Sequence, residues 1–276
     1  RMLPMSRPIL FTVLAAIAPQ MVLADNTTPV VDPVVVMQPE PIDSPELIFT
    51  LRLGANSAPA YFGSDEYEPG VDFAVGVQYL RLPFNQTIGS TDPSAKEYGF
   101  GPRGSLRYIK KRTAADNPEL TGLNDIDLSI ELGMGIGYTQ EFYRLFADAR
   151  YGFVGHNSWV GELGADVMVN PTDRLLLTLG PRVRLGDDGF TETYFGVTPA
   201  ESAASGLAAF SPSGGVNSAG LEFTADYTLN DKWSVAGAAR WDRLLNDAAA
   251  SPITALGSKD QFYIRIGLVR EFTLNF

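Results

Sequence analysis

The segment "QFYIRIGLVREFTLNF", residues 261–276, decides the fold class of this chain. Apolar side chains fall on every second residue, and Arg270 is the one charged residue among them. Successive side chains of a β-strand point to opposite sides of the sheet, so this alternation predicts a strand with one apolar face. That face ends on an aromatic residue. It consists of Phe262, Ile264, Ile266, Leu268, Phe272, Leu274 and Phe276.

The same alternation recurs along the chain from residue 46 onwards. In "IDLSIELGMGIGY", residues 126–138, the even positions are apolar and the odd positions are acidic, Ser or Gly. In "YRLFADARYGF", residues 143–153, Phe146 alone departs from the pattern. Such repeated alternation is typical of an all-β protein with long antiparallel strands. The ten candidate strands are 47–57, 70–80, 97–109, 126–138, 143–153, 158–170, 173–187, 219–229, 232–243 and 260–276.

The predicted connections alternate between tight turns and long polar segments. "TQEF", "NPTD" and "LNDK" are rich in residues that favour turns. One end of the sheet is therefore expected to carry only short turns, and the other, which we call the elaborated end, to carry the long connections. Two connections fit less well, because 155–158 is short and 81–96 is long, and a twelve-stranded arrangement stays open if 81–96 and 187–198 form further pairs. The long connections are 58–69, 110–125, 187–214 and 245–259.

Two architectures produce such strands: a soluble sandwich or barrel with its apolar face inward, and a membrane barrel with that face towards lipid. The polar face carries charges of both signs together with glycines at 133, 135, 137, 152 and 164. Small residues on this face suit the narrow interior of a small membrane barrel. The charged positions are Arg52, Asp72, Arg103, Arg107, Asp127, Glu131, Arg144, Asp148, Arg150, Glu162, Asp166, Arg182, Arg184, Glu222, Asp226, Arg240 and Arg265.

The last strand favours the membrane barrel. Its aromatic end resembles the terminal signature of bacterial outer-membrane barrels, so Phe272, Leu274 and Phe276 are predicted to be the signal that the barrel assembly machinery recognises. We therefore expect a transmembrane antiparallel up-and-down β-barrel of about ten strands, in contact with outer-membrane lipid and lipopolysaccharide. Aromatic residues at strand ends would form its interfacial girdles. They are Tyr138, Trp159, Tyr227, Trp233 and Trp241.

Residues 1–24 are typical of a cleaved secretory signal peptide. Two arginines precede the apolar stretch "PILFTVLAAIA", and small or apolar residues lead to Ala24. The stretch is shorter than the roughly 20 residues that a spanning helix needs, which favours cleavage over a membrane anchor. Residues 25–45 contain five prolines, which disfavour helix and sheet. We expect a periplasmic tether there and the barrel over 46–276.

The composition excludes several kinds of functional site. The chain has no Cys and a single His, which excludes disulfides, thiolate metal sites, Cys nucleophiles and multi-histidine metal centres. Its formal net charge of −11 argues against binding to nucleic acid. We therefore expect no cofactor, no bound metal and no nucleic-acid partner.

The segment "APAYFGSDEYEPG", residues 58–70, is predicted to be a rim loop at the elaborated end. Its aromatic side chains either join the outer aromatic girdle or close the mouth of the barrel against aromatic residues of 187–214. The candidate rim contacts are Tyr61, Phe62, Tyr67, Tyr194 and Phe195.

The basic cluster Lys110, Lys111 and Arg112 lies at the same end. These side chains are candidates for contacts with lipopolysaccharide phosphates, because ammonium and guanidinium groups bind phosphate well. A solvated rim is the alternative.

Catalytic and calcium sites receive weak support. His156 lies in "VGHNSWV" beside Asn157 and Ser158, but adjacency in sequence does not orient a base towards a nucleophile. We expect His156 to lie in a solvated loop and the protein not to be an enzyme. "DNPELTGLNDID" and "GDDGF" supply oxygen atoms without the spacing of an EF-hand, and are interpreted as solvated acidic turns.

Over residues 46–276 the sequence resembles the MipA/OmpV outer-membrane family, or MltA-interacting protein family. The resemblance rests on "LGANSAPAYFGSDEY", "TGLNDIDLSIELG", "TETYFGVTPAESAASGLAAFSPSGG" and "WDRLLNDAAASPIT". It implies an outer-membrane scaffold that brings a lytic transglycosylase together with a peptidoglycan synthase. The alternative is a narrow channel, or a surface adhesin or binding barrel that uses the long loops.

Overall fold

The computed structural model describes residues 45–82, 84, 86–91 and 98–275. The predicted signal peptide and all but the last residue of the predicted tether lie outside these residues. The described residues from 45 onwards belong to one compact unit. Within them, none of the helices has the length and apolar character needed to cross a membrane.

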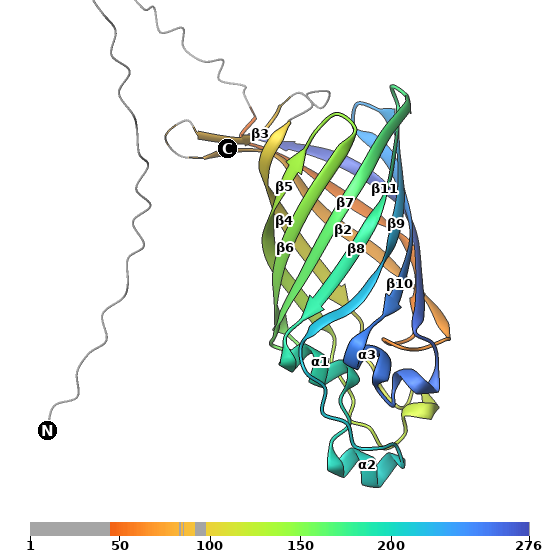
Figure 1. Cartoon of the computed structure of the whole chain (residues 1–276). Coiled ribbons are helices and arrows are strands. Elements are labelled where there is room, and N and C mark those ends of the chain that lie inside the picture. The colour runs from red at the N-terminus through yellow and green to blue at the C-terminus, as the bar shows by residue number, and fades with distance from the viewer. Residues whose placement is uncertain (1–44, 83, 85, 92–97, 276) are drawn as a thin grey trace, which may run out of the picture. The chain divides into compact units, whose positions relative to one another are not determined.

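The unit is built on one antiparallel sheet of eleven strands, which curls around on itself (Figure 1). The strand order is β3-β2-β1-β11-β10-β9-β8-β7-β6-β5-β4, so the last strand of the chain pairs with the first long one. The strands are β1 (Leu47–Pro59), β2 (Tyr67–Leu82), β3 (Gln86–Gly89), β4 (Gly99–Ile109), β5 (Ser129–Thr139), β6 (Tyr143–Val154), β7 (Trp159–Thr172), β8 (Leu175–Gly186), β9 (Gly215–Asn230), β10 (Trp233–Leu244) and β11 (Asp260–Leu274).

Each of the ten predicted strands overlaps one long strand of the sheet, so the all-β prediction is confirmed. The additional strand, β3, is short and pairs with the end of β2, as the open alternative for 81–96 allowed. The corresponding alternative for 187–198 is wrong, because the helix α1 (Asp188–Phe195) occupies most of that range. The Asp187 side chain accepts a hydrogen bond from the Phe190 N–H and starts this helix instead of continuing β8.

The edges of the curled sheet approach each other along β2 and β4. Their Cα atoms come within 8 Å, and an ion pair joins Glu68 of β2 to Lys110 just beyond β4. Among the described residues, no strand ladder joins β4 to β2 or to β3. The curled sheet therefore has two edges that meet side by side.

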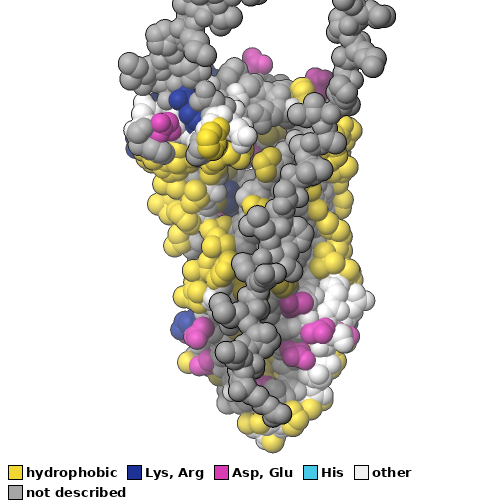
Figure 2. Space-filling view, turned by 90° about the vertical axis from the view of Figure 1, so that its left-hand side faces the viewer, with side chains coloured by type: hydrophobic (Ala, Val, Ile, Leu, Met, Phe, Trp, Pro, Cys, Tyr) yellow, Lys and Arg dark blue, Asp and Glu magenta, His cyan; other side chains and the backbone are white. Residues whose placement is uncertain are grey.

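The two faces of the sheet have the opposite polarity to those of a soluble protein. Apolar side chains of the outer face are exposed, as for Leu53 at 64% and Met134 at 75%. Charged side chains of the inner face are buried, as for Glu131 at 0% and Asp166 and Arg182 at 2% each. Figure 2 shows hydrophobic side chains gathered along both the left and the right side of the molecule in this view. Soluble proteins bury apolar groups, so the sheet fits a lipid surround and not the soluble alternative.

Short helices form in the long connections and lie together at one end of the sheet, opposite β3 (Figure 1). We call residues 60–66, 110–128, 187–214 and 245–259 the cap. The second cap helix starts with a capping box, in which Thr198 and Glu201 satisfy each other's backbone N–H groups. The helical segments of the cap are η2 (Pro118–Leu120), α1 (Asp188–Phe195), α2 (Pro199–Ser205), α3 (Asn246–Ala250) and η3 (Thr254–Leu256).

Candidate functional site

The interior of the curled sheet is filled by ion pairs between neighbouring and facing strands. Nearest the cap, Glu131 of β5 accepts a hydrogen bond from Arg150 Nε of β6 at 2.9 Å, and Arg107 NH1 of β4 lies 3.7 Å away. Both Glu131 and Arg150 are buried. A carboxylate held between two guanidinium groups on adjacent strands offsets the cost of burying either charge alone.

A second group of charges crosses the interior. Glu162 of β7 pairs with Arg240 of β10 at 2.6 Å, although these strands are not neighbours in the sheet. Arg240 Nε also bonds Asp242 at 2.7 Å, and Arg184 of β8 lies 3.1 Å from the same carboxylate. Because β8 and β9 lie between β7 and β10 in the sheet, this pair reaches across the interior past two strands.

A third group lies further from the cap. Asp166 of β7 accepts hydrogen bonds from Arg144 and from Arg182 NH2, each at 2.6 Å. Arg52 of β1 pairs with Asp72 of the neighbouring β2, and Arg103 of β4 pairs with Asp148 of β6, on the far side of β5. The charges that the sequence places on the polar face are thus largely neutralised in pairs inside the sheet.

Phe146, which departs from the alternation, lies among these charges. The guanidinium of Arg103 is 4.1 Å from the centre of its ring and that of Arg182 is 5.1 Å away. A Cβ at Gly164 would come within 2.2 Å of the ring, so glycine at this position leaves the space that the ring fills. The aromatic ring is an interior cation–π partner, which explains an apolar residue on the polar face.

The prediction that His156 lies in a solvated loop is wrong. His156 is 7% exposed, and its Nε2 lies 3.3 Å from Glu131 Oε1. Its ring packs edge-on against Phe190 and Tyr194 of α1. The short connection 155–158 turns inward because the ring fills space beside Gly152, where a Cβ would come within 2.4 Å of it. His156 therefore links the lumen charges to the cap.

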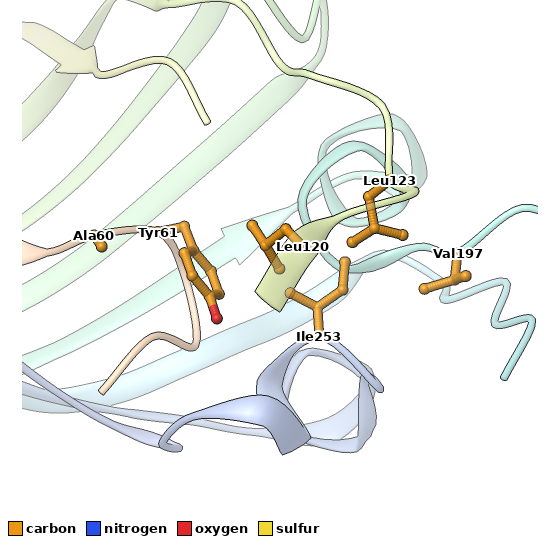
Figure 3. Close-up of a cluster of buried hydrophobic side chains, with 6 residues drawn as sticks. All are labelled: Ala60, Tyr61, Leu120, Leu123, Val197 and Ile253. Atoms are coloured by element: carbon orange, nitrogen blue, oxygen red, sulfur yellow. The ribbon is translucent and has the colours of Figure 1, made fainter. Parts of the chain in front are cut away.

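The cap has two apolar clusters. The strand-side cluster joins α1 and α3 to the ends of β7 and β10, and Phe62 packs against it. The loop cluster joins segments that are far apart in the sequence, and its side chains converge from four connections (Figure 3). The strand-side cluster is Val160, Phe190, Tyr194, Phe195, Leu244 and Ala248, and the loop cluster is Ala60, Tyr61, Leu120, Leu123, Val197 and Ile253.

The structure brings together four of the five predicted rim residues within the cap. Phe62 lies 5.0 Å from Tyr194 and 6.0 Å from Phe195, measured between ring centres, so the first and third long connections touch. Tyr61 lies in the loop cluster instead. Tyr67 is 43% exposed on β2, outside both clusters. Contact of these residues with an external ligand stays a prediction.

The predicted basic cluster is divided among different partners. Lys110 pairs with Glu68 across the edges of the sheet, and Lys111 pairs with Asp116 at 3.1 Å. Arg112 is 5% exposed and donates to the Tyr194 carbonyl at 3.0 Å, at the end of α1. Its guanidinium is therefore directed into the cap. Lipopolysaccharide contact stays a prediction, for which the exposed Lys111 is the best placed of the three.

The predicted acidic turns are ordered by hydrogen bonds within the protein. Asp187 accepts from the Phe190 and Trp159 N–H groups, and Asp188 accepts from the Gly214 N–H. Asp125 accepts from the Ala114 N–H. Among the described residues, no group of three or more His, Asp or Glu side chains is arranged to hold a metal ion.

The end of β11 lies at the opposite end of the sheet from the cap. Phe272 stacks on Phe49 with ring centres 5.3 Å apart, and the Arg270 guanidinium lies 4.9 Å from the Phe272 ring. Leu274 is 45% exposed. Phe276 lies outside the described residues, so the assembly signal as a whole stays a prediction.

Burial in the cap changes several pKa values. Burial, helped by the nearby Glu119 carboxylate, raises the pKa of Tyr61 well above its ordinary value. Burial also raises the pKa of Tyr194 and lowers that of Arg112. For Glu201, burial acts to raise the pKa, but hydrogen bonds from the Asn124 and Thr198 N–H groups outweigh it and the pKa is lowered. The Glu201 carboxylate is therefore a fixed anion that joins α2 to the connection after β4.

Three features of the cap were not predicted from the sequence. The pattern Thr198–Glu201 before α2 is a capping box that the sequence does display. Gln261, at 1% exposed, accepts from the Gly63 N–H and donates to the Ser64 carbonyl, which fixes the first long connection to β11. Ile253 is fully buried although its neighbours in sequence are polar or small. No local pattern reports the last two contacts, because both depend on segments far apart in the chain.

The sequence of the chain matches a family model and curated relatives. A family model described as "MltA-interacting protein MipA" matches residues 51–272. "MltA-interacting protein" of Escherichia coli (strain K12) and of Shigella flexneri are each 38% identical over 79 residues, 29% of this chain. That alignment spans 32% of the length of each relative.

Solved structures with a similar arrangement are distant in sequence. A "Bacterial polysaccharide outer membrane secretin" is 10% identical with a TM-score of 0.35, over 83% of this chain and 100% of that chain. An outer membrane channel from Pseudomonas putida F1 is 10% identical with a TM-score of 0.40, over 83% of this chain and 96% of that chain.

Proposed function

Because the chain belongs to the MipA family of MltA-interacting proteins, we propose that it acts as a closed outer-membrane platform for enzymes that remodel the cell wall. It is a bacterial outer-membrane protein built on a curled β-sheet. The finer proposal is a transmembrane barrel of ten long strands with a cleaved signal peptide, whose partners are a lytic transglycosylase and a peptidoglycan synthase.

The observation that supports a platform over an open channel is the filled interior. The Glu162–Arg240 pair crosses the lumen between non-neighbouring strands, and Phe146 stacks between guanidinium groups further along it. The cap adds two apolar clusters at one end. An open water column needs an unobstructed lumen, as in barrels of 16 or more strands. A narrow barrel whose interior holds paired charges and an aromatic ring is better suited to be a rigid support than an open channel.

The proposed orientation follows from the two ends of the sheet. The cap, with its long connections, would face the cell exterior. The short turns, the start of β1 and the end of β11 would face the periplasm. Partners that act on peptidoglycan would then bind at the short-turn end, where the proline-rich tether joins β1. Lipopolysaccharide and the barrel assembly machinery are further proposed partners.

A pull-down from envelope extract tests the platform. The mature chain is compared with a variant that lacks residues 25–45 and with Lys111→Glu, a matched control on the exposed cap surface. We expect the mature chain and Lys111→Glu to enrich a lytic transglycosylase and a peptidoglycan synthase, and the deletion variant to lose most of that enrichment. Enrichment of neither enzyme by any of the three would contradict the proposal.

Planar-bilayer recording tests closure separately. The purified full chain should give no steady unitary conductance, because charged pairs and the cap obstruct the lumen. Large, steady conductance at neutral pH would show an open channel and would contradict the closed platform even if the enzymes bind.

A second candidate function is binding at the cell surface through the cap. It is favoured by an open polar cleft of about 200 Å³ whose wall includes Ser213, Asn246 and Asp247. Ser213→Lys, at an exposed residue of the cleft wall, would alter the cleft without entering either apolar cluster. Intact-cell binding that is unchanged by this substitution would count against the second candidate.

A further inference from the structure

A small cavity of about 20 Å³ lies where the cap meets the lumen charges. One part of its wall is apolar and comes from Phe190, Phe195 and Leu244. The other part is polar and includes Arg184 of β8, Asn217 of β9 and Asp242 of β10, three strands that are consecutive in the sheet. The cavity therefore lies beneath the strand-side cluster and against the ion pairs of the lumen.

Each of these three polar residues contributes a buried atom with no hydrogen-bond partner in the protein. The atoms are Arg184 Nε, Asn217 Nδ2 and Asp242 Oδ1. Asn217 is 6% exposed and Asp242 is 1% exposed. Among the described residues only five buried side-chain atoms are unpartnered, and three of them belong to residues that line this one cavity, which marks it as a polar site.

A β-bulge directs Asn217 into this site. Arg184 is opposite Ser218 and Leu185 is opposite Val216, so Asn217 is the extra residue that has no position across the ladder. Asn217 and Ser218 are consequently both buried, whereas consecutive residues of a regular strand face opposite sides. The Asn217 Oδ1 atom accepts from Thr191 Oγ1 at 3.3 Å, which orients the amide and leaves Nδ2 as the unpartnered donor.

The other two groups are equally constrained. Asp242 Oδ2 accepts from Arg240 Nε at 2.7 Å and lies 3.1 Å from Arg184 NH1, which leaves Oδ1 as the unused acceptor. Arg184 Nε is 3.9 Å from the Glu162 carboxylate, beyond hydrogen-bond length. Two donors and one acceptor thus have fixed positions on the wall.

The chemistry of these groups selects the occupant. A cation would meet the N–H groups of Arg184 and Asn217, and an anion would meet the Asp242 carboxylate. A neutral molecule that accepts two hydrogen bonds and donates at least one satisfies all three, and water does so. A volume of about 20 Å³ admits one water molecule, since roughly 10–15 Å³ is the least that one requires.

We propose that this cavity is a specific hydration site, in which one ordered water molecule accepts hydrogen bonds from Arg184 Nε and Asn217 Nδ2 and donates one to Asp242 Oδ1. The water joins β8, β9 and β10 beneath the cap and gives each of the three unpartnered atoms a hydrogen-bond partner. The site does not depend on the identity of any protein partner.

A high-resolution crystal structure of the full mature chain in detergent or lipid tests this site. We expect one solvent peak within about 2.7–3.2 Å of all three atoms. Three results would each overturn the proposal: no density at this position, density for an alkyl chain of detergent or lipid, or a structure in which the three atoms bond to protein groups.

A matched pair of variants sharpens the test. Asn217→Leu removes the Nδ2 donor and fills space, so the solvent peak should be lost. Ser218→Ala lies on the same wall but removes none of the three unpartnered atoms, so the peak should remain. If the solvent peak persists in Asn217→Leu, the bulged residue Asn217 is not needed to hold the water, and that part of the proposal is overturned. Should Asn217→Leu fail to fold, the wild-type density alone decides the proposal.

Discussion

The interior of the sheet and the cap of this protein are held together by different interactions. The interior contains buried ion pairs such as Glu131–Arg150 and Asp166–Arg182, whereas the cap is held by apolar clusters around Phe195 and Ile253. The strands already expose their apolar side chains on the outer face, which leaves the polar side chains to pack inside. The cap projects beyond the apolar belt and, with water around it, buries apolar side chains as a soluble domain does. The side chains of the sheet are therefore arranged for a lipid surround, and those of the cap for water.

The largest expected effect comes from breaking the lumen network at Glu131. Glu131→Ala would leave the buried His156 without its carboxylate and Arg150 with only the longer carboxylate contact to Glu162 at 3.4 Å, and removal of one partner of a buried pair costs about 3–5 kcal/mol. We expect the temperature at which the barrel unfolds on heating in SDS to fall steeply.

The exposed pair Lys110–Glu68 provides the control for Glu131→Ala. Glu68→Gln should change the unfolding temperature little, since an exposed ion pair contributes about 0–1 kcal/mol. Equal effects of the two substitutions would show that the buried charges do not hold the lumen together.

In the cap, Ile253→Ala should loosen the loop cluster without unfolding the sheet. Ile253 is fully buried, and such truncations cost about 2–5 kcal/mol. Limited proteolysis should cut the cap faster, while the β-sheet signal in circular dichroism stays unchanged. Leu256→Ala is the matched control, because Leu256 is 40% exposed. Loss of the sheet signal in Ile253→Ala would mean that cap and sheet unfold together.

A smaller effect is expected at the start of α2. Thr198→Ala removes the side chain that caps the Glu201 N–H, at a cost of about 1 kcal/mol. Proteolysis around residues 199–205 should accelerate modestly and the rest of the cap should be unaffected. No change in the rate of cleavage would show that Glu201 alone holds the start of this helix.

The smallest expected effect is a pH dependence of cap stability through Glu201. Its pKa is lowered in the folded protein, so the unfolded chain binds the proton more readily. The stabilisation is present above the ordinary glutamate pKa, about 4.3, and is lost as the pH falls through the lowered folded value. Proteolysis of the cap with an acid-active protease should accelerate over this range.

Glu201→Gln should be less stable at neutral pH than the native cap and should show a weaker acid dependence. An unchanged acid dependence in Glu201→Gln would assign it to other groups.

The sequence predicted the strands better than it predicted the cap. Alternation within each strand is local, so all ten long strands were located, and the 17 charged positions of the polar face include most of the lumen pairs. His156 was misplaced because its local surroundings are polar and turn-like, while its actual neighbours, Glu131 and Phe190, come from other elements. The contact of Phe62 with Tyr194 was one of two open alternatives, since aromatic residues suit both an interfacial girdle and a buried cluster.

The sequence by itself determined the period-two strands and the identity of their two faces, because side-chain direction along a strand depends only on position. Only the tertiary structure decided which charge meets which, that Asn217 is a bulge, and that four distant connections form one cap. Those outcomes depend on strand register and on contacts between segments separated by up to about two hundred residues, such as Gly63 with Gln261. Neither register nor such contacts leave a repeating local pattern in the amino-acid order.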